Sequence, residues 1–211
     1  GLSCPAQRIG RITHYASREA MDIETLGEKN VTQLVDRGLV EDLSDLYRLR
    51  AQDLERLDGF AEKAAHKLYR AVQDSTNPPL DRFLYALGIR HVGQHVALVL
   101  ARRFGTLELL EEAGEEELQE VEEIGPEIAR SVHRFFREER NRRILEELKQ
   151  QGLQVRGAPQ AEAQELQGKT IVFTGDLERY TRDQARELVE GMGGRATSSV
   201  SGETDYVVAG E

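Results

Sequence analysis

The sequence predicts a mainly α-helical protein that ends in a small α/β unit. A pattern of apolar residues around a short break occurs four times between residues 23 and 132. The stretch 75–80, with two prolines, separates the second copy from the third, and the polar stretch 153–165 precedes a segment with strand-like runs. Because such stretches interrupt helices and strands, they divide the chain into two pairs of repeats and a terminal unit.

The repeat aligns on Gly27, Ala61, Gly93 and Gly125, which lie 34, 32 and 32 residues apart. Four further columns are apolar, at the first and fourth residues before the aligned one and at the fourth and seventh after it. Their members are Leu26, Phe60, Val92 and Ile124; Ile23, Leu57, Ile89 and Val121; Val31, Ala65, Ala97 and Ala129; and Leu34, Leu68, Leu100 and Val132. Offsets of four and seven form one stripe on a helix. Each copy therefore predicts two helices joined by a hairpin, with glycine where the backbone turns.

This pattern resembles the helix-hairpin-helix motif, whose usual form is apolar-Gly-apolar-Gly, three residues and Ala. The resemblance implies four tandem motifs in two pairs, which bind DNA phosphates through backbone N–H groups without reading bases. A helix start suits an anion because its first N–H groups have no acceptor within the helix and its dipole is positive there. For any single copy, a hairpin used only for packing is the alternative.

Charge predicts that the four hairpins differ in DNA binding. The third has two basic residues and no acidic one, so it is the strongest candidate, whereas the first and second each combine a lysine with a glutamate. The fourth has three glutamates around Gly125, and Pro126 offers no N–H, so it is expected to be a packing element. The residues expected to contact DNA are Gly27, Lys29, Gly59, Ala61, Lys63, Arg90, His91, Gly93 and His95.

The net charge of −10 argues against a uniformly basic nucleic-acid binder. Residues 106–127 hold ten glutamates and no lysine or arginine, so the rest of the chain is balanced. The segment 128–150, in which Asn141 marks an expected helix restart, is either a solvated helix face or a DNA-facing stripe. Its arginines are Arg130, Arg134, Arg137, Arg140, Arg142 and Arg143.

The terminal segment predicts the order β-α-β-β. Residues 168–175 form a strand-like run, Thr181 and Gln184 a capping box, and Gly193-Gly194 a helix stop, with short strands in 195–200 and 205–210. These residues resemble the first part of a BRCT domain. Some relatives bind phosphate at the positions of Lys169, Thr174 and Gly175, but a strand-turn role is preferred here, and phosphopeptide binding is not predicted.

Cys4-Pro5, the run "AMDIETLGEK" and the run "LYALGIRHVG" closely resemble bacterial NAD-dependent DNA ligases. The resemblance implies a C-terminal fragment with five parts. These are the end of a zinc-finger region (1–15), a first helix-hairpin-helix pair (16–76), a second pair (77–152), a linker (153–164) and the N-terminal part of a BRCT domain (165–211). The DNA-binding region of another repair enzyme, such as an excision nuclease subunit, and a non-catalytic interaction scaffold are the alternatives.

The resemblance implies an intact parent that uses NAD, zinc and magnesium to join 5′-phosphate and 3′-hydroxyl ends at nicks in double-stranded DNA, in replication and repair. The family's nucleotidyl lysine lies in a Lys-x-Asp-Gly motif, which this sequence lacks. Because that motif is absent, ligation is not expected of this chain. Cys4 would be the last of four zinc ligands and its three partners are missing, so tight cofactor binding is not expected either. With one cysteine and no apolar run or signal pattern, the chain is expected to be cytoplasmic, without membrane contact, and a monomer.

Overall fold

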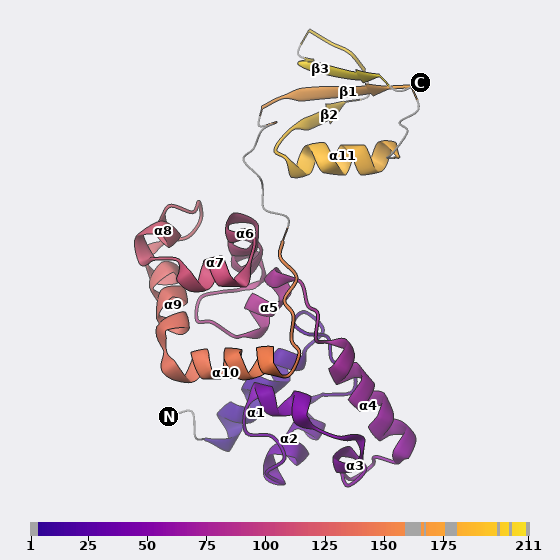
Figure 1. Ribbon diagram of the computed structural model, residues 1–211, viewed down its shortest axis with the longest axis vertical. Coiled ribbons are helices and arrows are strands. Elements are labelled where there is room, and N and C mark those ends of the chain that lie inside the picture. Colours follow the sequence, from indigo (N-terminus) through magenta and orange to yellow (C-terminus); the bar gives the residue numbers. More distant parts are fainter. Residues whose placement is uncertain are drawn as a thin grey trace. The chain divides into compact units, whose positions relative to one another are not determined.

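The computed structural model describes residues 4–158, 166, 168–175, 181–197, 199–202 and 204–209 (Figure 1). The chain divides into two units, Gly1–Ala158 and Pro159–Glu211. The first is helical, and the second combines a helix with a parallel sheet. Within the described residues, no helix is both long and apolar enough to cross a bilayer.

The helices of the first unit pack as four successive helix-hairpin-helix motifs. Within the copies, α1 packs on α2, α3 on α4, α5 on α6, and α8 on α9. The elements are α1 (Pro5–Ala16), α2 (Glu28–Asp36), the 3-10 helix η1 (Leu43–Arg48), α3 (Ala51–Leu54), α4 (Glu62–Asp74), α5 (Leu80–Ala86), α6 (Gln94–Phe104), α7 (Leu107–Glu112), α8 (Glu115–Gln119), α9 (Pro126–Arg137) and α10 (Glu139–Gln150). The predicted fold class, mainly α with tandem motifs in two pairs, is confirmed.

One continuous apolar core runs through all four copies. The residues four and seven positions after each aligned residue are completely buried, and they are Val31, Leu34, Ala65, Leu68, Ala97, Leu100, Ala129 and Val132. A small side chain at the first of these positions lets the two helices of a motif approach closely. The apolar columns of the repeat are therefore the packing surface of each motif.

Polar contacts join the two copies of each pair. In the first pair, the Gln33 amide donates to the Asp58 carbonyl at 3.2 Å and accepts from the Asp58 N–H at 2.8 Å. In the second pair, His95 Nε2 lies 2.6 Å from Glu123 Oε2. In both pairs, the second helix of the earlier copy thus contacts the hairpin of the later copy.

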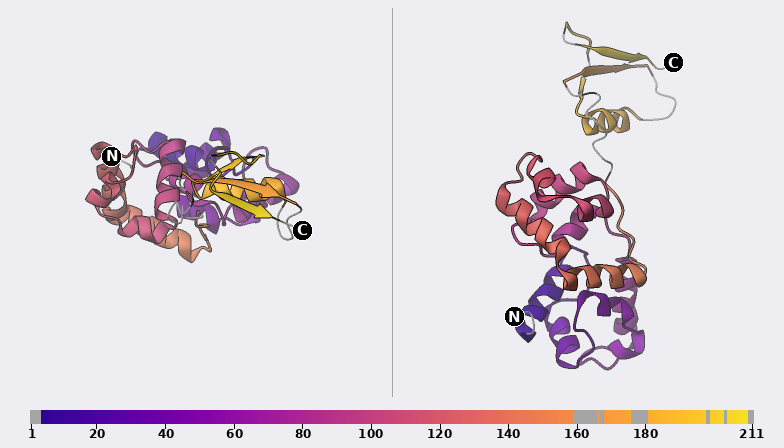
Figure 2. Two further views of the ribbon diagram at one scale, coloured as in Figure 1. Left: turned by 90° about the horizontal axis from the view of Figure 1, so that it is seen from above. Right: turned by 60° about the vertical axis from the view of Figure 1, so that its left-hand side comes forward.

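Hydrogen bonds join the first pair to the second. His14 on α1 donates through Nε2 to the Tyr85 carbonyl on α5 at 2.8 Å, and Arg82 Nε donates to the Ala20 carbonyl at 2.8 Å. Helix α10 lies between the two pairs in Figure 1 and in the right-hand view of Figure 2. The four motifs consequently form one body rather than two separate hairpin pairs.

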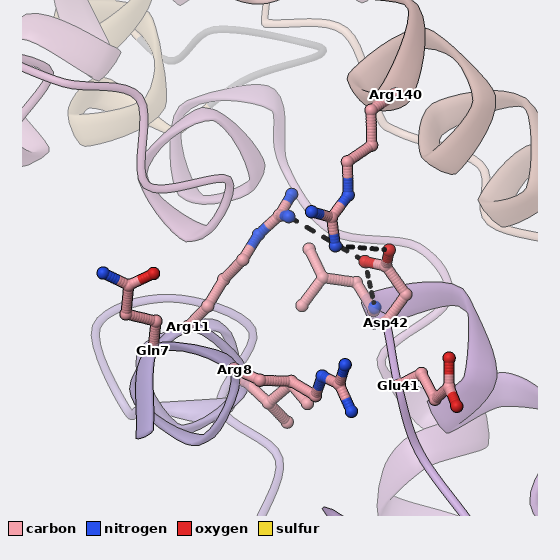
Figure 3. Close-up of a pocket in the computed structure, with 8 residues that line it drawn as sticks. Gln7, Arg8, Arg11, Glu41, Asp42 and Arg140 are labelled. Atoms are coloured by element: carbon pink, nitrogen blue, oxygen red, sulfur yellow. Dashed lines mark hydrogen bonds and ion pairs between the residues drawn. The ribbon is translucent and has the colours of Figure 1, made fainter. Parts of the chain in front are cut away.

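Asp42, just before η1, gathers two arginines from distant elements. Its carboxylate lies 3.9 Å from Arg11 Nη1 of α1 and 3.5 Å from Arg140 Nη2 of α10. Figure 3 shows both guanidinium groups pointing toward this carboxylate. Burial lowers the pKa of Arg11, and the charge of Asp42 opposes that shift. This contact links α1 and α10 to the start of η1.

The joint between α9 and α10 lies earlier than expected. Helix α9 ends at Arg137 and α10 begins at Glu139, so the predicted restart at Asn141 is wrong by about half a turn. The buried Asn141 amide donates to the Phe135 carbonyl at 3.1 Å and to Glu138 Oε2 at 3.2 Å. Asn141 therefore ties the two helices together from inside the first turn of α10.

The expected linker begins on the surface of the first unit. Gln154 N–H donates to the Thr76 carbonyl at 2.7 Å, Arg156 N–H to the Pro78 carbonyl at 2.8 Å, and Leu80 N–H to the Arg156 carbonyl at 3.0 Å. These bonds lay the chain beside the proline-containing stretch 75–80. Residues 159–164 of the expected linker lie outside the described part of the chain.

The second unit has the predicted order β-α-β-β, with β1 (Thr170–Thr174), α11 (Arg182–Gly191), β2 (Arg195–Thr197) and β3 (Tyr206–Ala209). The strands are parallel in the order β2-β1-β3. A Cβ on Gly194 would lie 2.8 Å from Val189 Cγ1 and 3.1 Å from the Val189 carbonyl, so glycine is required where α11 turns toward β2. The Gln184 half of the predicted capping box falls outside the described side chains.

Lys169 and Asp205 form a contact at the start of β1. The Asp205 carboxylate accepts from the Thr170 N–H at 2.8 Å and from Lys169 Nζ at 3.1 Å. The Thr170 hydrogen bond, and then that of Lys169, lower the pKa of Asp205. In this structure Lys169 fastens the loop before β3 to β1, in keeping with the preferred strand-turn role.

Candidate nucleic-acid interface

All four hairpins have the same backbone conformation. The residue two positions before the aligned one has a positive φ in every copy, and the four are Thr25 (68°), Gly59 (83°), His91 (68°) and Glu123 (70°). The aligned residue caps the following helix with an ordinary extended backbone, at φ −82°, −82°, −86° and −75°. The expectation that the aligned glycine serves the turn is therefore wrong, because the chain turns two residues earlier.

Packing does not require the aligned glycines either. A Cβ added to Gly27, Gly93 or Gly125 would meet nothing within 4 Å, and Ala61 already occupies the position in the second copy. Glycine at the helix start thus has no role inside the folded chain. What it provides is an uncovered backbone that a group from outside can approach.

The backbone hydrogen bonds of the hairpins also repeat. The N–H before the aligned residue donates to the carbonyl three residues earlier at 3.0 to 3.3 Å, and the carbonyl of the aligned residue accepts from the fourth N–H after it at 2.9 to 3.0 Å. The N–H groups between these positions belong to the first turn, where an α-helix has no regular internal acceptor for them, although in the first copy the Asn30 N–H donates to the Gly27 carbonyl at 3.0 Å. Helix α9 offers one fewer, since it begins with Pro126.

The four hairpins share a backbone conformation but differ in their exposed side chains. The second residue of each helix is exposed, and these residues are Lys29, Lys63, His95 and Glu127. The third hairpin brings exposed Arg90 and His91 close to Gly93 and the start of α6, as the repeat predicts. His95 lies on the same turn but contacts Glu123 of the fourth hairpin. From the sequence, the first three of these residues are predicted DNA contacts, and the fourth is one of the glutamates around Gly125.

A cleft beside the third hairpin is the feature that sequence reasoning missed. It has a volume of about 440 Å³ and lies between the third hairpin and one face of α9. Its lining residues are Ile89, Arg90, His91, Glu127, Arg130, Ser131, Arg134, Phe135 and Glu138. The spacing of Arg130 and Arg134 by one helical turn was the available signal, but the sequence does not show that this face meets the third hairpin.

The six arginines of 128–150 do not form one stripe. Arg137 donates to the carbonyls of Glu111 and Glu112 at the end of α7, and Arg140 contacts Asp42. Arg143 lies 4.0 Å from Glu147 on its own helix. Only Arg130 and Arg134 among the six line the cleft.

Cys4 is exposed and directly precedes α1. A structural zinc site takes four cysteine or histidine ligands. In the described part of the chain, no group of three or more histidine, cysteine or acidic side chains could hold a metal ion. The residues present supply one ligand and do not by themselves fit a zinc ion.

Family comparisons agree with this architecture. Residues 17–74 match the model described as a SAM-like helix-hairpin-helix tandem, residues 82–145 the helix-hairpin-helix motif, and residues 163–211 the BRCA1 C Terminus (BRCT) domain. The fold and the hairpins thus define a tandem helix-hairpin-helix protein with a BRCT segment.

Over its whole length the chain is similar to curated DNA ligases. It is 48% identical to the DNA ligase of Syntrophus aciditrophicus, 50% to that of Syntrophotalea carbinolica and 48% to that of Salinibacter ruber. Each comparison covers 100% of this chain but only 30 to 31% of the relative. The chain therefore spans about a third of the length of these relatives.

Proposed function

We propose that the chain grips duplex DNA through its backbone phosphates, as the DNA-binding region of an NAD-dependent DNA ligase that seals nicks in replication and repair. One observation carries the proposal. The four hairpins share a backbone, and in the three that begin the second helix with glycine, that glycine is needed neither for the turn nor for packing. Similarity to DNA ligases over the whole chain supports the choice of enzyme.

Each of the first three hairpins would hold one phosphate at the start of its second helix, whereas the acidic fourth hairpin serves packing. A phosphate oxygen accepts hydrogen bonds from the N–H groups of the first turn, where the positive end of the helix dipole adds to the attraction. Backbone donors do not distinguish bases, so the grip is independent of sequence. The third hairpin contributes most through Arg90, His91 and Gly93, while Lys29 and Lys63 support the first and second.

The catalytic chemistry belongs to the intact parent. NAD would supply the adenylyl group, magnesium would neutralise phosphate charge, and zinc would be held by Cys4 with three further ligands. This chain lacks the Lys-x-Asp-Gly motif, and its residues do not by themselves fit zinc. We therefore expect it to bind nicked duplex DNA as a cytoplasmic monomer without joining the ends.

The test is binding to a labelled nicked duplex, measured by fluorescence anisotropy over a series of salt concentrations. If three hairpins each hold one phosphate, log K should fall linearly with log salt at a slope of about −3. Two duplexes of equal length and unrelated sequence should bind within about twofold of each other. Absent binding, or affinity that does not change with salt, would favour the interaction-scaffold alternative instead.

A further inference from the structure

The two pairs of motifs differ at one equivalent contact. In the first pair, Glu24 lies three residues before the aligned Gly27, and its carboxylate is 3.0 Å from Nζ of Lys67 on α4. Lys67 lies six residues after Ala61. The residues at the same two positions of the second pair are Arg90 and Ser131. An ion pair thus bridges the hairpin and the helix in the first pair, and its two charged partners are both replaced in the second.

The second pair has its cleft at this place. Arg90 of the third hairpin and Ser131 of α9 both line it, together with Arg130 and Arg134, which lie one turn apart on α9. Arg90 and Arg134 are both exposed. Positive groups from two elements therefore line the cleft at the place where the first pair has opposite charges in contact.

All charged groups around the cleft give a cationic centre between two acidic ends. Glu127 and Glu138 also line it, but Glu127 lies in the first turn of α9 and Glu138 directly follows its last residue, with the arginines between them. Arg130 Nε lies 3.7 Å from Glu115 of α8, which offsets part of its charge. Arg90, Arg134 and, when protonated, His91 remain to attract an anion.

We propose that this cleft binds one backbone phosphate of a DNA strand, as a site additional to the helix start of the third hairpin. The inference rests on the proposed function, since the strand is the one that the hairpins hold. Guanidinium groups suit this role because their N–H donors match the geometry of phosphate oxygens and their charge persists at every physiological pH. The fourth motif would then contribute to DNA binding through the side of α9 rather than through its acidic hairpin.

The main experiment compares R134Q with R142Q in the full 211-residue chain, using the salt series with nicked duplex. Both variants remove one exposed arginine charge, but Arg142 lies on α10 and does not line the cleft. We expect R134Q to bind about tenfold more weakly and to reduce the salt slope by about one. R142Q should remain within about twofold of the unaltered chain, and thermal unfolding should show that both variants fold.

A second pair of variants imitates the ion pair of the first motif pair. S131E places a carboxylate opposite Arg90, whereas S131Q places a neutral side chain of the same size there. We expect S131E to weaken duplex binding about tenfold and S131Q to change it by less than about threefold. Equal effects of the two would contradict an anion in the cleft.

The outcomes separate this inference from the proposed function. If the unaltered chain does not bind duplex, both are wrong. If duplex binds and G93V weakens it, but R134Q behaves like R142Q, only the cleft is excluded as a DNA site. Inorganic pyrophosphate tests the other source of the same chemistry, because the cleft is as large as small-ligand pockets. Pyrophosphate binding that R134Q abolishes, with duplex affinity unchanged, would assign the cleft to a free polyphosphate and overturn the proposal.

Discussion

The third and fourth hairpins have the same backbone and opposite surfaces. Their turn residues, His91 and Glu123, have φ values of 68° and 70°, and the small residues beneath them, Ala97 and Ala129, are both completely buried. Around this shared frame, the third hairpin exposes Arg90 and His91, whereas the fourth exposes three glutamates. The apolar columns thus determine the shape of a motif, and the exposed columns beside the helix start determine what it attracts.

The largest predicted effect is a loss of stability that should be equal in the third and fourth motifs. Replacing Ala97 or Ala129 by leucine forces extra volume between two helices in contact, so each change should lower the free energy of unfolding by about 2 to 3 kcal/mol. Urea denaturation of the first unit's helical signal measures this. If one variant were tolerated and the other not, the two motifs would not share the packing that their burial indicates.

The next effect should separate the two motifs. Gly93→Val places a branched side chain where a phosphate would approach, so nicked-duplex affinity should fall about tenfold, or about 1.4 kcal/mol. Gly125→Val should change it by less than about twofold, because the fourth hairpin is acidic and begins its helix with proline. Neither Cβ meets a neighbour within 4 Å, so both variants should fold. Equal losses would show that charge does not decide which hairpin binds DNA.

The smallest effect concerns the turn itself. A non-glycine residue at positive φ costs about 1 to 2 kcal/mol of folding free energy. Glycine removes this strain, but it loses more conformational entropy on folding, which costs about 0.5 to 1 kcal/mol. His91→Gly and Glu123→Gly should therefore each stabilise the first unit by about 0.5 kcal/mol, as measured by the urea midpoint. Destabilisation by only one of them would reveal a side-chain contact that the other hairpin lacks.

The fold could be predicted from the sequence because the apolar columns of the repeat mark the packing surfaces. Residues such as Ala65 and Leu100 have one physical role there, which is to fill the core. The turn was misplaced because three of the four turn residues, Thr25, His91 and Glu123, are not glycine and carry no visible conformational signal. The sequence also did not show which arginines of 128–150 form internal contacts and which line the cleft. Whether Arg140 meets Asp42 or Arg134 meets the third hairpin depends on contacts between residues 44 to 98 positions apart, which periodicity does not encode.

Asp42 has a mechanical consequence for the array of motifs. One carboxylate lies near arginines of the first helix and of α10, which follows the last motif, so it links elements from the two ends of the repeat array. A link of this kind between the first helix and the helix after the last motif opposes spreading of the array. If the chain grips duplex as proposed, the spacing of its hairpins would set which phosphates they can hold.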